Sequence, residues 1–212
     1  MLRHPTLEQL RVLRLDGMAK AFEEQLQMAE VEDLRFEDRL ALLIDREVTE
    51  RNNRRLQTRL RKAKLRQKSA CVEDIDYRAR RGLDKGLFLS LSSCDWIVQH
   101  RNVLITGPTG VGKTYRACAL AQKACREGHT VQYLRLPRLL EDLALAHADG
   151  RYHKLMAGFA RTDLLVLDDW GLAPFGDADR RELLEILEDR HELRSTLVTS
   201  QLPVDTWYEA ID

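Results

Sequence analysis

The sequence has no long apolar run. No stretch of its 212 residues approaches the roughly 18 consecutive apolar residues that a membrane-spanning helix requires. The first residues, Met1 to Pro5, also lack the apolar core of a secretory signal peptide. We therefore expect a soluble, cytoplasmic protein with no membrane partner.

Cysteine is scarce as well. The four cysteines form no C-x-x-C pair and have no histidine nearby at the spacing of zinc ligands. They are Cys71, Cys94, Cys118 and Cys125. Because neither a disulfide framework nor a zinc site is indicated, we expect reduced thiols, most of them packed in the core.

Acidic residues are missing from one segment, although the whole chain carries no net charge. Residues 51–68 contain nine basic residues and no acidic one. Such a helix end favours binding to a polyanion. On duplex DNA, each neutralised phosphate steepens the plot of log binding constant against log salt concentration by about 0.9. A solvated helix face, or partners for the Glu-rich stretch before it, would explain the same charges.

A glycine-rich loop is the most informative motif. The apolar residues 103–106 predict a buried strand, and the next eight residues match the phosphate-loop pattern G-x-x-x-x-G-K-[ST]. They are Gly107, Pro108, Thr109, Gly110, Val111, Gly112, Lys113 and Thr114. Backbone N–H groups and the N-terminus of the following helix would hold phosphates, Lys113 would reach the β- and γ-phosphates, and Thr114 would ligate Mg²⁺. The pattern predicts a nucleotide site, and a chance glycine-rich turn before a helix is the alternative.

Two aspartates supply the second half of that site. Residues 164–167 form an apolar strand that ends at Asp168 and Asp169, 55 residues after Lys113. A buried strand can direct an acid to a metal only from its end, so we expect Asp168 to hold Mg²⁺ and Asp169 to polarise the attacking water. Strand-end capping is the alternative. The sequence D-D-W-G also fits the D-x-x-G of switch GTPases, but no Asn-Lys-x-Asp element is present, which favours ATP.

A polar residue at the end of a further strand completes the predicted catalytic set. Residues 195–200 predict a fourth strand lying between the phosphate-loop strand and the aspartate strand. Gln201 is our first candidate for contacting the γ-phosphate or the attacking water, and Ser200 is the second. A solvated strand end is the alternative.

The order of predicted elements indicates an α/β fold. We expect a P-loop NTPase with a parallel sheet flanked by helices, preceded by a small all-α domain. In that domain Thr6 is a candidate cap of a first helix, residues 18–29 predict a second helix, and a third is expected to begin near Phe36. The expected boundaries are 1–68 for the helical domain with its basic C-terminal helix, 69–101 for a linker and pre-strand segment lining the nucleotide site, and 102–212 for the ATPase core. Within the linker, residues 71–78 are expected to be extended and residues 87–98 to form a helix. Ile75, Tyr77 and Arg81 are candidates for lining the base, with core packing as the alternative for the first two.

Four strings of residues resemble one known family. They are GPTGVGKT, LLVLDDWG, RSTLVTSQLPVDTW and CVEDIDYRARRGLDKGLF, and they resemble IstB, the ATP-binding helper of IstA/IstB-type insertion sequences. The resemblance covers essentially the whole chain. It implies an AAA+ module of the DnaA/DnaC branch that binds ATP and Mg²⁺, assembles as a homo-oligomer on duplex DNA with little sequence preference, and assists an IstA-type transposase.

The resemblance also implies individual roles. Residues 107–114 would be the Walker A loop, Asp168 and Asp169 the Walker B pair, and Gln201 or Ser200 the sensor-1 position. Residues 138–160 would form the initiator-type insertion that faces DNA, with Arg151 and Lys154 as phosphate contacts. As isolated residues, both would more often be solvated charges.

In modules of this family, a fifth strand, an arginine finger and a sensor-2 arginine follow the position of residue 212. We therefore expect the core to lack its C-terminal end. We also expect ATP hydrolysis to need those missing parts and neighbouring subunits. Arg190 and Arg194 would lie near a subunit boundary or serve as helix-end charges. The alternatives are a replicative helicase loader of the DnaC kind and a non-hydrolysing, ATP-gated adaptor. A small-molecule kinase would need a lid that the sequence does not indicate.

Overall fold

The computed structural model describes residues 4–28, 31, 33–78, 82–172 and 175–207, and the chain forms two compact units, residues 1–58 and 59–212. The long helix α3 (Phe36–Ala63) contains the division between them. Across the described ranges, no helix combines the length and apolarity needed to cross a membrane. Each unit is described separately below.

The first unit consists of helices. α1 (Pro5–Val12) begins at a proline rather than at the predicted capping residue Thr6, and the proline suits this position because its fixed φ matches the helix and its missing N–H would have no helical partner. α2 (Asp16–Gln25) begins two residues before the predicted Met18. α3 begins at Phe36 as predicted.

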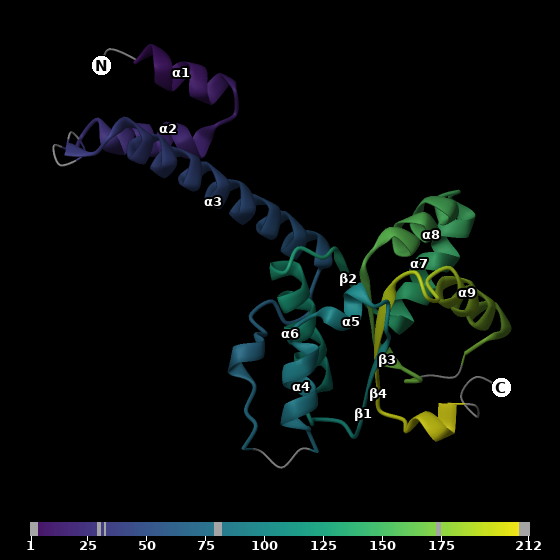
Figure 1. The fold of residues 1–212 in the computed structure, drawn as a ribbon. Coiled ribbons are helices and arrows are strands. Elements are labelled where there is room, and N and C mark those ends of the chain that lie inside the picture. Colours follow the sequence, from purple (N-terminus) through teal and green to yellow (C-terminus); the bar gives the residue numbers. More distant parts are fainter. Residues whose placement is uncertain (1–3, 29–30, 32, 79–81, 173–174, 208–212) are drawn as a thin grey trace. The chain divides into compact units, whose positions relative to one another are not determined.

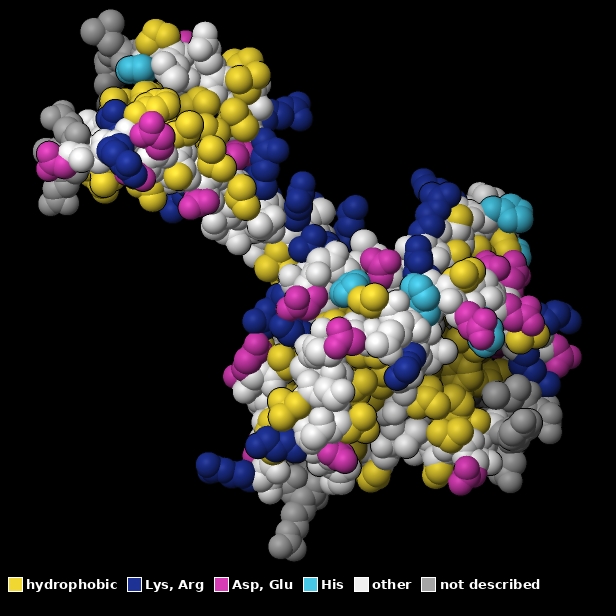
Figure 2. Space-filling model, viewed as in Figure 1, with side chains coloured by type: hydrophobic (Ala, Val, Ile, Leu, Met, Phe, Trp, Pro, Cys, Tyr) yellow, Lys and Arg dark blue, Asp and Glu magenta, His cyan; other side chains and the backbone are white. Residues whose placement is uncertain are grey.

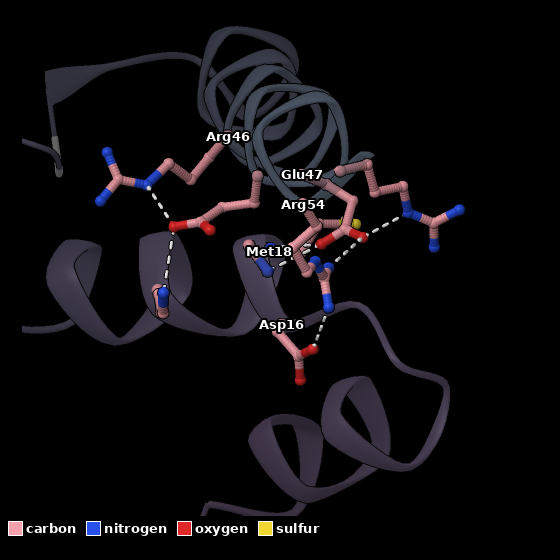
Figure 3. Close-up of polar contacts among 9 residues, drawn as sticks. Asp16, Met18, Arg46, Glu47 and Arg54 are labelled. Carbon is pink, nitrogen blue, oxygen red and sulfur yellow. Dashed lines mark hydrogen bonds and ion pairs between the residues drawn. The ribbon is translucent and has the colours of Figure 1, made fainter. Parts of the chain in front are cut away.

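A buried glutamate joins α2 to α3. Glu47, only 6% exposed, accepts hydrogen bonds from the backbone N–H groups of Gly17 (2.7 Å) and Met18 (3.2 Å), and so caps the first turn of α2 from another helix (Figure 3). Its second oxygen accepts from Arg51 at 2.6 Å. Although burial raises the pKa of Glu47, these hydrogen bonds outweigh it and hold the pKa below its ordinary value.

The first unit buries few large apolar side chains. In its described part, the buried hydrophobic residues are Ala19 and Ala21. Figure 2 shows hydrophobic side chains gathered on the face drawn over α1 to α3. The exposed ones include Val12, Leu13, Leu26, Met28, Phe36, Leu42, Ile44 and Val48.

The second unit contains a four-stranded parallel sheet in the order β1-β4-β3-β2. The strands are β1 (Val103–Thr106), β2 (Val131–Arg135), β3 (Leu164–Trp170) and β4 (Ser195–Ser200). β4 therefore lies between β1 and β3, as predicted. The prediction that residues 103–106 are buried is wrong, because β1 is at the edge of the sheet and Leu104 is 47% exposed.

Helices cover both faces of this sheet (Figure 1). On one face lies α6 (Lys113–Arg126), whose small buried residues, such as Ala117 and Ala121, allow close approach to the strands. The opposite face packs against α7 (Leu136–Ala148), α8 (Tyr152–Arg161) and α9 (Asp177–Glu188). The core on that side is formed by Leu136, Leu139, Leu143, Met156, Phe159, Leu165, Leu167, Trp170, Phe175, Leu183, Ile186 and Val198. The predicted α/β class is confirmed.

Several predicted elements have different boundaries. The predicted helix over residues 87–98 is two helices, α4 (Lys85–Leu91) and α5 (Asp95–Val98), because Cys94 between them has a positive φ of 65° that no helix can continue through. The segment predicted as extended, residues 71–78, contains a short 3₁₀ helix at Val72–Asp74.

Candidate functional site

The glycine-rich loop leads from β1 directly into α6. Gly112 occupies the N-cap position of α6 with a φ of 92°, a left-handed conformation that glycine adopts without strain. The first N–H groups of α6 have no carbonyl partner within the helix and are available to an anion. The loop therefore has the backbone geometry of a phosphate cradle.

Lys113 lies within this loop. Its ammonium donates to the carbonyl oxygens of Gly107 at 2.6 Å and Pro108 at 3.0 Å. Burial lowers the pKa of Lys113, while the carboxylates of Asp168 and Asp169 act in the opposite direction. The side chain is held over the loop by neutral carbonyls, which phosphate oxygens could replace as stronger, charged acceptors.

An irregularity in β3 brings the side chains of two successive aspartates near one arginine. Adjacent side chains of a regular strand point to opposite faces of a sheet. In β3 the pairing with β4 is irregular between Leu167 and Trp170, and Asp169 has a φ of 67°. As a result, Arg66 Nη1 lies 3.8 Å from an oxygen of Asp168 and 3.8 Å from one of Asp169.

Asp168 is completely buried and is held by three hydroxyl groups. The Thr114 hydroxyl donates to this carboxylate, with Oγ1 lying 3.0 Å from Oδ1 and 3.1 Å from Oδ2. The Tyr133 hydroxyl donates to Oδ2, and the Thr199 hydroxyl donates to Oδ1. Burial and the bond to Asp168 raise the pKa of Tyr133, which keeps its hydroxyl protonated. Thr114 and Asp168, both predicted as Mg²⁺ ligands, are thus direct neighbours.

Asp169 contacts arginines that the sequence did not single out. Arg135 donates from Nε to Asp169 Oδ2 at 2.9 Å, and its Nη2 lies 2.9 Å from the same oxygen. Arg135 is the last residue of β2 and pairs in register with Asp168, so its place at a strand's carboxyl end was a usable signal. Arg66 gave no such signal, because it lay within a long run of basic residues.

The two sensor candidates differ in their surroundings. Gln201 Oε1 accepts from Thr109 of the phosphate loop at 2.8 Å and lines the cleft. Ser200 is 1% exposed, and its hydroxyl donates to the carbonyl of Trp170 at 2.9 Å. The structure therefore places Gln201 at the site and Ser200 in the packing beneath it, while Thr199 is the β4 residue that contacts Asp168.

These residues enclose one cleft of about 520 Å³. It is lined by Arg66, Gln67, Thr109, Gly110, Gly112, Lys113, Thr114, Tyr115, Arg135, Asp169, Leu172 and Gln201. An adjoining pocket of about 200 Å³ has Ile75, Val111 and Tyr115 in its wall. Tyr77 instead packs edge-on against Phe88, with ring centroids 6.3 Å apart. Arg81 lies outside the described residues.

Two of the sequence strings that carry the family resemblance meet beside the cleft. Trp170 stacks on Trp207, with ring centroids 5.3 Å apart. Gly171 follows with a φ of 71°, and a Cβ there would lie 2.9 Å from a methyl of Leu202. The D-D-W-G string is thus packed against the segment after β4, and a side chain larger than that of glycine at position 171 would meet Leu202.

The other predicted surface residues vary in exposure. Lys154 is exposed, and Arg151 is exposed but pairs with Asp149 at 2.6 Å. Arg190 is only 1% exposed, so its side chain is enclosed within the chain rather than presented on the surface. Its guanidinium donates to the carbonyls of Phe159, Thr162 and Ser195 and to the hydroxyl of Thr196. Burial lowers the pKa of Arg190 to about 10. Arg194 is partly exposed near Asp163.

Comparison with known proteins gave matches along the chain. The family model described as IstB-like ATP binding protein matches residues 8–212. An insertion sequence ATP-binding protein of Sinorhizobium fredii is 53% identical over 211 residues, covering 100% of this chain and 86% of the relative. One from the Pseudomonas fluorescens insertion sequence IS1162 is 50% identical over 206 residues, covering 97% and 89%.

Solved structures share the fold at low sequence identity. The DnaC helicase loader matches with a TM-score of 0.56 and 20% identity, covering 66% of this chain and 83% of that chain. DnaI matches with a TM-score of 0.58 and 19% identity, covering 67% and 77%. DnaA bound to AMPPCP and single-stranded DNA matches with a TM-score of 0.55 and 18% identity, covering 63% and 42%. These likenesses show that this chain shares the fold of DnaC, DnaI and DnaA.

Proposed function

This chain belongs to the family of IstB-like ATP-binding proteins, and from that premise we propose that it is an ATP-dependent AAA+ regulator of DNA transposition. In this proposal it binds duplex DNA with little sequence preference, assembles on the DNA as a homo-oligomer, and assists an IstA-type transposase. The observation that carries the proposal is a cleft lined by the phosphate loop, Asp169 and Gln201, with the buried Asp168 hydrogen-bonded to Thr114 in its wall.

The cleft fits a nucleoside triphosphate. The loop N–H groups and Lys113 would bind the phosphates, and the pocket walled by Ile75 and Tyr115 is our candidate for the base. Thr109 and Gln201 are already hydrogen-bonded across the loop, so Gln201 lies where it can contact the terminal phosphate or a water beside it.

The residues also fit Mg²⁺. Among the described residues no group of three or more His, Cys, Asp or Glu side chains gathers as a metal cage. Mg²⁺ does not need one, because it is usually held by one or two protein oxygen ligands and by substrate phosphates. The Thr114 hydroxyl and Asp168 carboxylate, 3.0 Å apart, provide those oxygens. When bound, the ion would neutralise charge on the phosphates.

For hydrolysis, Asp169 would orient and polarise the attacking water. In the structure its carboxylate is occupied by Arg135. We therefore propose that turnover requires Arg135 to leave Asp169, and that it is slow unless DNA or a neighbouring subunit favours that change. This makes ATP binding, rather than hydrolysis, the event that assembles the protein on DNA, with hydrolysis releasing it.

For DNA binding, the end of α3 and the residues after it are the candidate. Arg61, Lys62, Lys64 and Lys68 are exposed and form no ion pair within the described parts of the chain. Figure 2 shows Lys and Arg side chains along the C-terminal half of α3. Side chains without acidic partners are free to neutralise phosphates, which gives affinity without base recognition. Arg151 and Lys154 are the second set.

The likeness to DnaC keeps a helicase loader as the second candidate. Partner choice separates the two. We would mix the chain, with ATP and target DNA, with an IstA-type transposase or with a replicative helicase and measure strand transfer and helicase loading. Stimulated strand transfer supports the transposition helper, whereas helicase loading without any effect on strand transfer would refute it.

A further inference from the structure

The basic segment after residue 58 does not stand free of the ATPase core. Arg59 Nε donates to the carbonyl of Cys125, at the C-terminal end of α6, at 2.8 Å. Further along, Leu65 is 5% exposed and Ala70 is fully buried. The segment therefore runs alongside α6, toward the end that carries the phosphate loop.

Near that end the backbone is anchored again. The buried thiol of Cys118, one turn beyond Thr114 in α6, faces backbone groups of Arg66 and Gln67, which counteract the rise in its pKa that burial causes. Leu65 is buried just before Arg66. Because backbone on both sides of Arg66 is fixed, the direction in which its side chain leaves the segment is fixed too, and Arg66 lines the nucleotide cleft.

The guanidinium of Arg66 lies near both aspartates but forms no direct hydrogen bond with them. Its Nη1 lies 3.8 Å from oxygens of both Asp168 and Asp169, which is close enough for ion pairing and too far for a direct hydrogen bond. Arg135, in contrast, is hydrogen-bonded to Asp169 at 2.9 Å. The Arg66 side chain remains 49% exposed to the cleft and to solvent, so its N–H groups can reach a ligand there.

We propose that Arg66 binds the terminal phosphate of a nucleoside triphosphate within its own chain and gives the site preference for a triphosphate over a diphosphate. The inference rests on the proposed ATP site. The aspartates Asp168 and Asp169 put negative charge beside the place where the γ-phosphate would lie, and Lys113 is one compensating cation. Arg135 is already hydrogen-bonded to Asp169, whereas the Arg66 guanidinium, 3.8 Å from both carboxylates, offers a further cation with several directed donors.

The position of Arg66 also gives it a consequence for DNA binding. It belongs to the same anchored segment as Arg61, Lys62, Lys64 and Lys68, the candidate phosphate contacts. Binding of Arg66 to a γ-phosphate would therefore connect the nucleotide to the segment that carries these candidate contacts, without a change in its anchored backbone.

The test measures binding of a non-hydrolysable ATP analogue and of ADP, each with Mg²⁺, to the whole chain by calorimetry. We expect Arg66→Gln to weaken binding of the triphosphate analogue by about 10-fold or more, which is the effect of losing one charged hydrogen bond. The affinity for ADP should change by less than about threefold. The affinity of Arg66→Lys for the triphosphate analogue should lie between those of the unaltered chain and Arg66→Gln, since lysine keeps the positive charge but lacks the planar set of donors of a guanidinium. The matched control is Arg101→Gln, an exposed residue preceding β1, at the opposite end of that strand from the loop.

Thermal unfolding of each variant checks that the fold is retained. Equal weakening of both nucleotides by Arg66→Gln, or tighter binding of the triphosphate analogue, would overturn the role of Arg66 while leaving the ATP site intact. If the unaltered chain binds neither nucleotide, the proposed ATP site fails and the role of Arg66 fails with it.

Discussion

Replacing Asp169 with asparagine should separate ATP binding from ATP hydrolysis. The carboxylate is 17% exposed and accepts from Arg135 at 2.9 Å, while the neighbouring Asp168 keeps its three hydroxyl partners in the variant. The Arg135 pair is partly exposed, so its loss should cost about 1 kcal/mol of stability or less. Loss of the group that polarises water should slow hydrolysis by about 100- to 10,000-fold.

The assay is single-turnover hydrolysis of ATP in the presence of duplex DNA, together with DNA binding at saturating ATP. Asp169→Asn should bind ATP within about threefold of the unaltered chain and should still bind DNA in an ATP-dependent way. Asp189→Asn, at an exposed position after α9, is the control and should hydrolyse normally. Normal hydrolysis by Asp169→Asn, or loss of DNA binding while ATP binding persists, would refute the assignment.

Three further predictions concern binding and stability. Lys113→Ala should reduce ATP affinity at least about 10-fold in the same calorimetry, and unchanged affinity would contradict the phosphate role. Arg190→Met should lower the free energy of unfolding by about 3 kcal/mol in urea titrations, because it leaves several buried carbonyls without a hydrogen-bond donor. The control Arg194→Met should change the free energy of unfolding by less than about 1 kcal/mol. Similar values for the two variants would contradict the buried hydrogen-bond network. Because the pKa of Glu47 is lowered on folding, its stabilisation of the first unit should be complete above about pH 4.5 and lost as the pH falls through the lowered value; Glu47→Gln should flatten that acid limb in circular dichroism melts.

The sequence predicted the fold because local patterns and topology agree in the second unit. Apolar runs such as residues 164–167 form fully buried strands, and the phosphate loop forces the order strand, loop, helix. Predictions went wrong where one residue decides the backbone. Nothing in the composition around Cys94 indicates a left-handed φ, so the predicted helix over residues 87–98 was not divided.

The site was predictable as far as motifs define it. The sequence singled out Lys113, Thr114 and Asp168 because the motif for phosphate and metal binding restricts both residue type and spacing, and the structure brings Thr114 and Asp168 into contact. Tyr133 was missed because strand register, which brings β2 beside β3, is a property of the sheet, whereas Arg135 could have been noticed from its place at the carboxyl end of a predicted strand. Arg66 could not be found from a charge pattern that treats all basic residues of 51–68 alike, whereas packing along α6 distinguishes it from its neighbours.

The most direct measurement is the affinity of the whole chain for random-sequence duplexes of several lengths, over a series of salt concentrations, with a non-hydrolysable ATP analogue, with ADP and without nucleotide. The account predicts tight, cooperative binding only with the analogue, no dependence on sequence, and a salt slope of about 4 per subunit if Arg61, Lys62, Lys64 and Lys68 each meet a phosphate. Nucleotide binding without DNA affinity at any salt concentration, or DNA binding that ignores nucleotide, would contradict it.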